Sequence, residues 1–90
     1  MLEVTDARYV EGYKIHVRFN NGEAGVVDLE DYLWGPMFEP LKDIDVFKRF
    51  TVSAVLHTLC WENDADLAPE SLYEKMIEQS RAAQSRAQNS

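Results

Sequence analysis

The side chains in this sequence that most often perform acid–base or thiol chemistry are His16, His57 and Cys60. His16 stands between Lys14 and Arg18 in an alternating segment, so these three side chains should share the polar face of one strand. Acid–base catalysis needs a nucleophile or carboxylate within hydrogen-bond reach of the histidine, and none stands at a matching position. We therefore interpret His16 as a solvated strand residue.

His57 and Cys60 lie three residues apart in an apolar run, which in an extended chain places their side chains on opposite faces. No further Cys or His pair completes a tetrahedral zinc site, so a structural metal is not expected. Cys60 precedes Trp61 and is predicted to be a small buried apolar residue without catalytic thiol chemistry. Since it is the single cysteine, no intramolecular disulfide can form.

Polar residues also crowd the segment before the last helix, and an acidic loop of this kind can bind calcium. They are Glu62, Asn63, Asp64 and Asp66. An EF-hand loop needs a glycine at its sixth position and a distal glutamate, whereas this segment runs directly into residues 67–69, so turn formation is the simpler interpretation. The sequence has no phosphate-binding loop and no nucleophile elbow, so we predict no catalytic residue, no metal and no cofactor. A metal- or small-molecule-binding enzyme that gathers His16, His57 or residues 62–66 is the least favoured alternative.

The elements that must position these side chains begin with a strand over residues 13–19. Ile15, Val17 and Phe19 alternate with polar residues, which is typical of a half-buried strand. Asn21-Gly22 then favours a type I′ turn, because both central residues of that turn need positive φ. A two-residue loop predicts that Phe19 faces Ala24 and that Val17 faces Val26 on the core side.

The remaining elements complete an α+β fold. Residues 2–10 supply another strand, Asp28 and Asp43 each cap a short helix, and residues 51–61 form either one strand or a hairpin. Pro69 starts the last helix, whose apolar stripe should pack on the sheet. The stripe consists of Leu72, Tyr73, Met76 and Ile77. The predicted fold class is therefore an antiparallel β-meander of three strands, short helices, one further strand or hairpin, and a C-terminal helix packed on the sheet.

The chain is acidic, which restricts its partners. Sixteen acidic residues against nine basic ones give a formal net charge of −7. Because Lys and Arg normally supply the affinity for phosphates, this balance opposes binding to nucleic acid or to an anionic membrane. The N-terminal segment carries Glu3 and Asp6 and no apolar signal core, so we expect a cytoplasmic protein.

Two surfaces are predicted to contact a protein partner, most simply a small basic protein. One is an acidic ridge along the last helix, formed at i+4 spacing by Glu70, Glu74 and Glu78. The other is the exposed hairpin face with Lys14, His16 and Arg18. The alternative for the ridge is a solvated helix face whose charge is relieved by Lys75 and Arg81.

Residues 1–79 are predicted to form a single domain, and residues 80–90 a polar tail that extends the helix. The tail has a helix-forming composition but no residue larger than alanine on its apolar side. The alternative function is therefore a homo-oligomeric accessory protein that associates with itself through this helix, a homodimer included.

Three segments occur in a particular order, namely YKIHVRFNNGEAGVVDL, GPMFEPLKDIDVFKRF and WENDADLAPESLY. Their most specific positions are Trp61, Asn63, Asp66, Leu67, Pro69, Glu70, Leu72 and Tyr73, followed by Phe19, Gly22 and Asp28. From about residue 4 to residue 73 the chain resembles the small bacterial family called domain of unknown function 2442.

The resemblance implies a compact α+β fold and no enzyme activity. Members of that family are often encoded beside small proteins of domain of unknown function 4160, in pairs regarded as toxin–antitoxin modules, which implies an antitoxin-like role for this chain. The family usually has a glycine-containing turn between the positions of Phe50 and Trp61. This sequence has TVSAVLHTLC there, without glycine, so we expect a remodelled hairpin.

Overall fold

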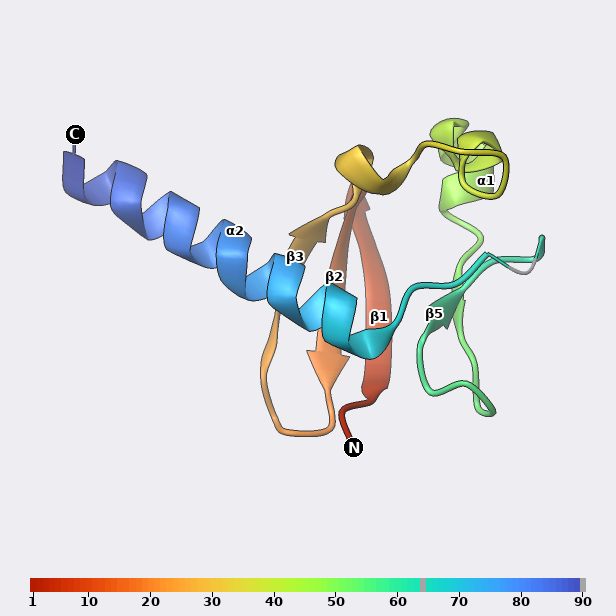
Figure 1. Ribbon diagram of the computed structural model, residues 1–90, viewed down its shortest axis with the longest axis horizontal. Helices are drawn as coiled ribbons and strands as arrows, with labels where there is room; N and C mark the ends of the chain where they lie inside the picture. The colour runs from red at the N-terminus through yellow and green to blue at the C-terminus, as the bar shows by residue number, and fades with distance from the viewer. Residues whose placement is uncertain (64, 90) are drawn as a thin grey trace.

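The computed structural model describes residues 1–63 and 65–89, with residues 83–89 described by their helical backbone alone. A three-stranded sheet, a two-stranded sheet and a long C-terminal helix are joined by short helical turns (Figure 1). In chain order the elements are β1 (Val4–Glu11), β2 (Lys14–Phe19), β3 (Ala24–Asp28), η1 (Glu30–Tyr32), η2 (Glu39–Lys42), α1 (Ile44–Phe47), β4 (Thr51–Val52), β5 (Leu59–Cys60) and α2 (Pro69–Asn89). The predicted α+β fold with its three-stranded antiparallel meander is confirmed.

The three-stranded sheet has β2 at its centre, with β1 and β3 antiparallel on either side. Ile15, Val17 and Phe19 are at most 1% exposed, so one face of the sheet forms the core, as the alternation predicts. Two register irregularities interrupt the pairing of β1, and they explain why apolar residues alternate imperfectly in that strand.

The predicted register between β2 and β3 is wrong by one residue. Val17 faces Gly25 and not Val26. Because residues directly opposite one another share a face, Val27 lies on the core side and is fully buried. Val26 lies on the outer side and is 45% exposed.

The reason for the shift is the length of the turn between β2 and β3. The Phe19 N–H donates to the Glu23 carbonyl at 2.8 Å, which leaves a three-residue loop instead of the predicted two-residue loop. Gly22 adopts a φ of 87°, whereas Asn21 does not adopt a positive φ. A type I′ turn needs positive φ at both positions, so the chain uses the longer turn that ends in a left-handed glycine.

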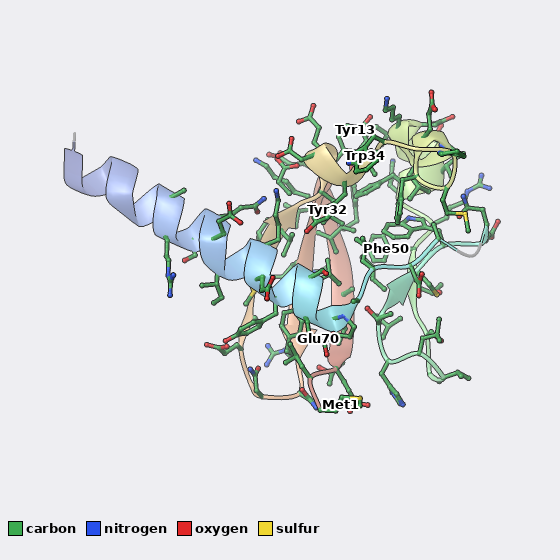
Figure 2. The ribbon with its side chains drawn as sticks, in the orientation of Figure 1. Met1, Tyr13, Tyr32, Trp34, Phe50 and Glu70 are labelled. Carbon is green, nitrogen blue, oxygen red and sulfur yellow. The ribbon has the colours of Figure 1, made fainter. Side chains whose placement is uncertain are left out.

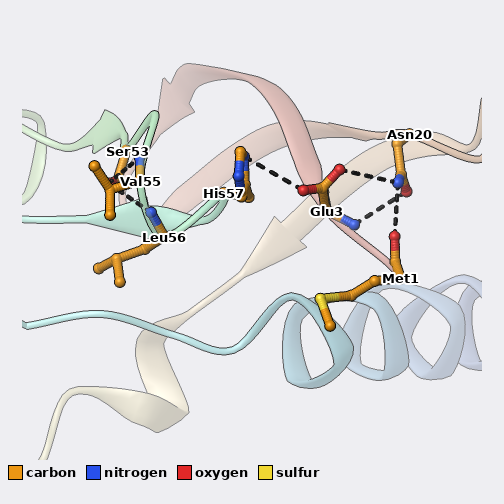
Figure 3. A network of polar contacts seen from close by, with 7 residues as sticks. All are labelled: Met1, Glu3, Asn20, Ser53, Val55, Leu56 and His57. Atoms are coloured by element: carbon orange, nitrogen blue, oxygen red, sulfur yellow. Dashed lines mark hydrogen bonds and ion pairs between the residues drawn. The ribbon is translucent and has the colours of Figure 1, made fainter.

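Residues 51–61 form a hairpin, which decides between the two alternatives. β4 pairs antiparallel with β5. In the turn between them, the Ser53 hydroxyl accepts the N–H groups of Val55 at 3.2 Å and of Leu56 at 3.0 Å (Figure 3). His57 then completes the turn with a φ of 54°.

Phe47 of α1 joins the short helices to both sheets. Its fully buried ring lies 5.3 Å from the ring of Tyr13 and 5.8 Å from that of Trp61. The Trp61 indole Nε1 donates to the Phe47 carbonyl at 2.8 Å. Asp43 caps α1 as predicted, since its carboxylate accepts the Asp45 N–H at 3.0 Å. Burying a side chain of this size stabilises the fold by roughly 1.5–3 kcal/mol.

The helix α2 begins at Pro69, as the sequence predicts, and packs on the core face of the sheet. Leu72 and Met76 are its most deeply buried residues, with exposed fractions of 0% and 5%. Gly25 permits this close packing, because a Cβ atom at that position would lie 3.0 Å from Met76 Sδ. The apolar stripe predicted for this helix therefore faces the sheet.

The C-terminal part of α2 extends beyond the sheet. The helix crosses the sheet in front of its strands and continues past β3 to Asn89 (Figure 1). Residues 80–89, predicted as a polar tail, continue this helix, and residue 90 lies outside the described residues. Within residues 1–63 and 65–89, no helix is long and apolar enough to cross a membrane.

Candidate interaction surfaces

The predicted hairpin face exists, but its charges are largely balanced. Lys14, His16 and Arg18 lie on the side of β2 away from the core. Arg18 stands opposite Asp6, and the Lys14 Nζ lies 3.7 Å from the Glu11 carboxylate. Exposed pairs of this kind contribute at most about 1 kcal/mol. The hairpin face therefore offers a partner little net charge.

The predicted acidic ridge is exposed along α2. Glu70, Glu74 and Glu78 stand on the side of the helix away from the sheet, and no ion pair among the described residues involves them. The Lys75 Nζ lies 3.5 Å from the carboxylate of Asp31 in η1 instead of turning toward the ridge. Lys75 therefore does not relieve the ridge charge in the way that the alternative interpretation supposes.

The ridge and the hairpin face lie on opposite sides of the three-stranded sheet. The helix α2 covers the core face of the sheet, whereas Lys14, His16 and Arg18 project from the other face. A partner that lies flat on one of these surfaces does not reach the other. They are therefore two separate candidate surfaces.

His57 and Cys60 do not form a joint site. His57 lies in a turn and not in the predicted strand, and its Nδ1 is 3.4 Å from a Glu3 carboxylate oxygen (Figure 3). Cys60 is half-buried and not fully buried as predicted, with Sγ 3.5 Å from the Thr51 hydroxyl. In the part of the chain that the structure describes, no three His, Cys, Asp or Glu side chains are grouped to hold a metal ion.

Asn63, one of the polar residues before the last helix, has a structural function in its loop. The Asn63 side chain accepts the Ala65 N–H at 3.2 Å and donates to the Met37 carbonyl at 2.9 Å. These bonds form the turn and attach it to the segment after η1. Asp64, which the sequence reasoning placed in this group, lies outside the described residues.

Tyr73 links α2 to the turn between β2 and β3. Its phenol donates a hydrogen bond to the Glu23 carboxylate, and its ring packs edge-on against Phe19 at 5.3 Å. The hydrogen bond to Glu23, together with burial and the negative charge of Glu23, raises the pKa of Tyr73 above its ordinary value of 10.0. The phenol acts as the hydrogen-bond donor of this contact.

The sequence reasoning missed an exposed aromatic surface at the loop between η1 and η2. Trp34 is 73% exposed and Met37 is 46% exposed. With their neighbours they line an apolar depression of about 240 Å³, called here the Trp34 surface, which consists of Tyr32, Trp34, Gly35, Pro36, Met37 and Phe38. Figure 2 shows Trp34 on the upper side of the molecule and Met1 on the lower side. The sequence signal that could have indicated this surface is the position of Trp34 and Met37 on either side of Gly35-Pro36. This dipeptide interrupts regular structure, so neither large side chain belongs to the apolar face of a helix or strand.

Acidic residues flank the Trp34 surface along the chain. Glu30 and Asp31 precede it, Glu39 follows it, and all three are exposed. The Asp31 side chain is 85% exposed although it pairs with Lys75, which is itself only 18% exposed. The Lys75 Nζ also lies 5.3 Å from the centre of the Tyr32 ring, so the exposed apolar surface has three acidic neighbours in the sequence and one cation against its edge.

The family model for DUF2442, described as a protein of unknown function, matches residues 4–78 of the 90-residue chain. The chain belongs to the DUF2442 family. The resemblance recognised in the sequence is thereby confirmed. No curated protein and no solved structure matches this DUF2442 chain.

This DUF2442 chain has no glycine in the turn between β4 and β5, and His57 occupies the left-handed position. The turn is nevertheless attached to the N-terminal segment, since the Val4 N–H donates to the His57 carbonyl at 2.9 Å. Asn20 continues this network by accepting the Glu3 N–H at 3.0 Å and donating to the Met1 carbonyl at 2.7 Å (Figure 3). The hairpin is therefore attached to the first residue of β1 through the His57 carbonyl.

Proposed function

We propose that this DUF2442 protein is a non-catalytic protein-binding module that docks a small basic protein on the Trp34 surface. The observation that supports the proposal is the 73% exposure of Trp34 beside the exposed Met37. Contiguous exposed apolar patches with a polar border are typical of interaction sites. Tryptophan is also the residue type most enriched among side chains that dominate binding energy.

The charge distribution supports a basic partner. Exposed Glu30, Asp31 and Glu39 flank the Trp34 surface in the sequence, and the chain as a whole carries a net charge of −7. Complementary charge at the border accelerates association, while the buried aromatic group supplies most of the affinity. Burying the exposed part of Trp34 in a partner would contribute roughly 1.5–3 kcal/mol.

The acidic ridge of Glu70, Glu74 and Glu78 is a second proposed contact, because its carboxylates remain exposed and unpaired among the described residues. For the identity of the partner, the resemblance to the family favours a small protein of domain of unknown function 4160. In that case the chain would act in the cytoplasm as the antitoxin-like member of a pair.

The test is co-expression with the product of the neighbouring gene, followed by size exclusion and calorimetry of the purified complex. We expect the Trp34→Ala variant to bind at least about tenfold more weakly than the wild type. The matched control is Val55→Ala, which removes another highly exposed apolar side chain, 83% exposed, from the distant β4–β5 turn. Equal affinity of the wild type and Trp34→Ala would reject the Trp34 surface, and failure of the neighbour to co-elute would remove the support for a paired partner.

Self-association is the second candidate function, favoured by the part of α2 that continues past β3 (Figure 1). A helix segment without a sheet beneath it gains stability when a second copy packs against it. Light scattering gives the mass of the full chain and of a chain that ends at Ser80, and so distinguishes a monomer from an oligomer. A monomeric mass for both chains would exclude this alternative.

A further inference from the structure

β3 is an edge strand, and alternate residues turn their main-chain N–H and C=O groups away from the sheet. The Phe19 N–H donates to the Glu23 carbonyl at 2.8 Å, so Glu23 and every second residue after it pair with β2. Ala24, Val26 and Asp28 therefore direct their main-chain groups outward, where an additional strand would pair.

The outward groups of Asp28 are already satisfied by a side chain of α2. The Gln79 amide nitrogen donates to the Asp28 carbonyl at 3.0 Å, and the Gln79 amide oxygen accepts the Asp28 N–H at 2.9 Å. Among the described residues, nothing makes the same contacts with Ala24 and Val26. The edge of β3 is thus closed at its C-terminal end and open at its N-terminal end.

A groove of about 510 Å³ lies beside this open edge. Ala24 and Val26 line one wall, and Met76, Ile77 and Ser80 of α2 line the other. A strand added to the sheet would lie about 4.7–4.9 Å from β3. The helix α2 continues past β3 on this side (Figure 1). A strand added to β3 would therefore have one face covered by the helix.

We propose that this groove, the β3 edge groove, binds an extended segment of a basic protein as a fourth strand of the sheet. Main-chain bonds to Ala24 and Val26 provide affinity, and alternate side chains of the segment pack on Met76 and Ile77. The inference rests on the proposed function only in that both require a protein partner. The groove is a separate surface from the Trp34 surface.

Charge favours a basic segment over a second copy of this chain. Exposed Glu23 stands at one end of the groove and half-buried Asp28 at the other, and β3 contains no basic residue. Basic residues at the two ends of a bound segment would approach these carboxylates. A second copy would add a further charge of −7 and would place the same carboxylates opposite one another.

The experiment uses the full chain, labelled with ¹⁵N, and a synthetic peptide with a Val-Thr-Val-Thr-Val centre and two lysines at each end. Hydrogen exchange of individual amides is followed by NMR. On saturation with the peptide, we expect exchange at Ala24 and Val26 to slow by at least about tenfold, because both amides gain a hydrogen-bond acceptor.

Two altered peptides and two protein variants isolate the main-chain pairing and the charge. A peptide methylated on alternate backbone nitrogens keeps its side chains but loses its donors, and a peptide with glutamate in place of lysine reverses the charge. We expect either change to weaken binding by at least about tenfold. Val26→Pro removes an outward N–H and should weaken binding likewise, whereas Val26→Thr, which keeps that N–H, should not. The methylated peptide gives the same information if Val26→Pro does not fold.

Several results would overturn the proposal. They are absence of binding by the lysine peptide at millimolar concentration, binding without protection of Ala24 and Val26, and equal binding of the methylated or glutamate peptide. Protection that appears without peptide as protein concentration rises would assign the groove to a second copy. Because exchange is followed for each amide separately, protection of Ala24 and Val26 reports on the β3 edge groove alone, so a failure there leaves the test of the Trp34 surface intact.

Discussion

The two tryptophans of the chain lie in regions with opposite roles. Trp61 is 4% exposed, and its Nε1 donates to the Phe47 carbonyl at 2.8 Å. Trp34 is 73% exposed and lies in the loop between η1 and η2. Trp61 therefore helps to hold the two sheets and α1 together. Trp34 instead exposes apolar area to solvent.

The difference follows from what surrounds each side chain. The ring of Trp61 lies between the rings of Phe47 and Phe50, at 5.8 and 6.5 Å, so its burial completes an aromatic core. Trp34 precedes Gly35, whose φ of 85° turns the chain before any element covers the indole. The comparison teaches that the core and the proposed binding surface use the same residue type in separate parts of this small domain.

The largest expected effect tests the region of Trp61. Trp61→Ala should lower the free energy of unfolding by about 3–5 kcal/mol, because it removes a buried ring and leaves the Phe47 carbonyl without its donor. Trp34→Ala should change it by less than about 0.5 kcal/mol. Urea denaturation of both variants measures the contrast, and equal losses would show that the two regions do not differ in this way.

The next effect tests whether α2 is packed on the sheet as tightly as the aromatic core is packed. Gly25→Val should lower the free energy of unfolding by about 1–3 kcal/mol, because its side chain meets the Met76 thioether. Gly25→Ala should cost less, since the Cβ alone lies 3.0 Å from a flexible side chain that can shift. Thermal or urea unfolding measures both variants. An unaffected Gly25→Val protein would show that α2 is loosely held.

A smaller effect concerns the attachment of α2 to the turn between β2 and β3. The pKa of Tyr73 is raised in the folded state, so the stabilisation from its bond to Glu23 is fully present below pH 10.0. It is lost as the pH rises through the raised pKa. The wild type should therefore lose stability more steeply above pH 10.0 than Tyr73→Phe does, as measured by urea midpoints at several pH values. Parallel profiles for the two proteins would contradict the assignment.

The smallest effect tests the turn of the β4–β5 hairpin. His57→Gly should raise the free energy of unfolding by about 0.5 kcal/mol, because relief of the left-handed conformation slightly exceeds the entropy cost of glycine. His57→Ala keeps the backbone strain and loses the contact with Glu3, so it should not stabilise the protein. Thermal unfolding compares the three proteins. If His57→Ala stabilised the protein, the destabilising feature of the wild type would be the imidazole and not the left-handed backbone conformation.

Sequence reasoning identified most elements but few of the candidate sites. Alternation in β2, the Asp43 cap and Pro69 at the start of α2 are local signals, and all three predicted their elements. The exposure of Glu70, Glu74 and Glu78 followed from helical spacing. The Trp34 surface and the β3 edge groove depend on which residues lie next to segments distant in sequence, and no local pattern contains that information.

What the sequence determined by itself is the set of elements, since hydrophobic periodicity, caps and breakers act over a few residues. Tertiary structure decided the register of β2 against β3, because both possible loops place Gly22 at the turn. The observed register places Gly25, the one residue of β3 without a side chain, beneath Met76 of α2. Tertiary structure also decided which tryptophan is buried, because burial depends on the packing of neighbouring elements and not on residue type.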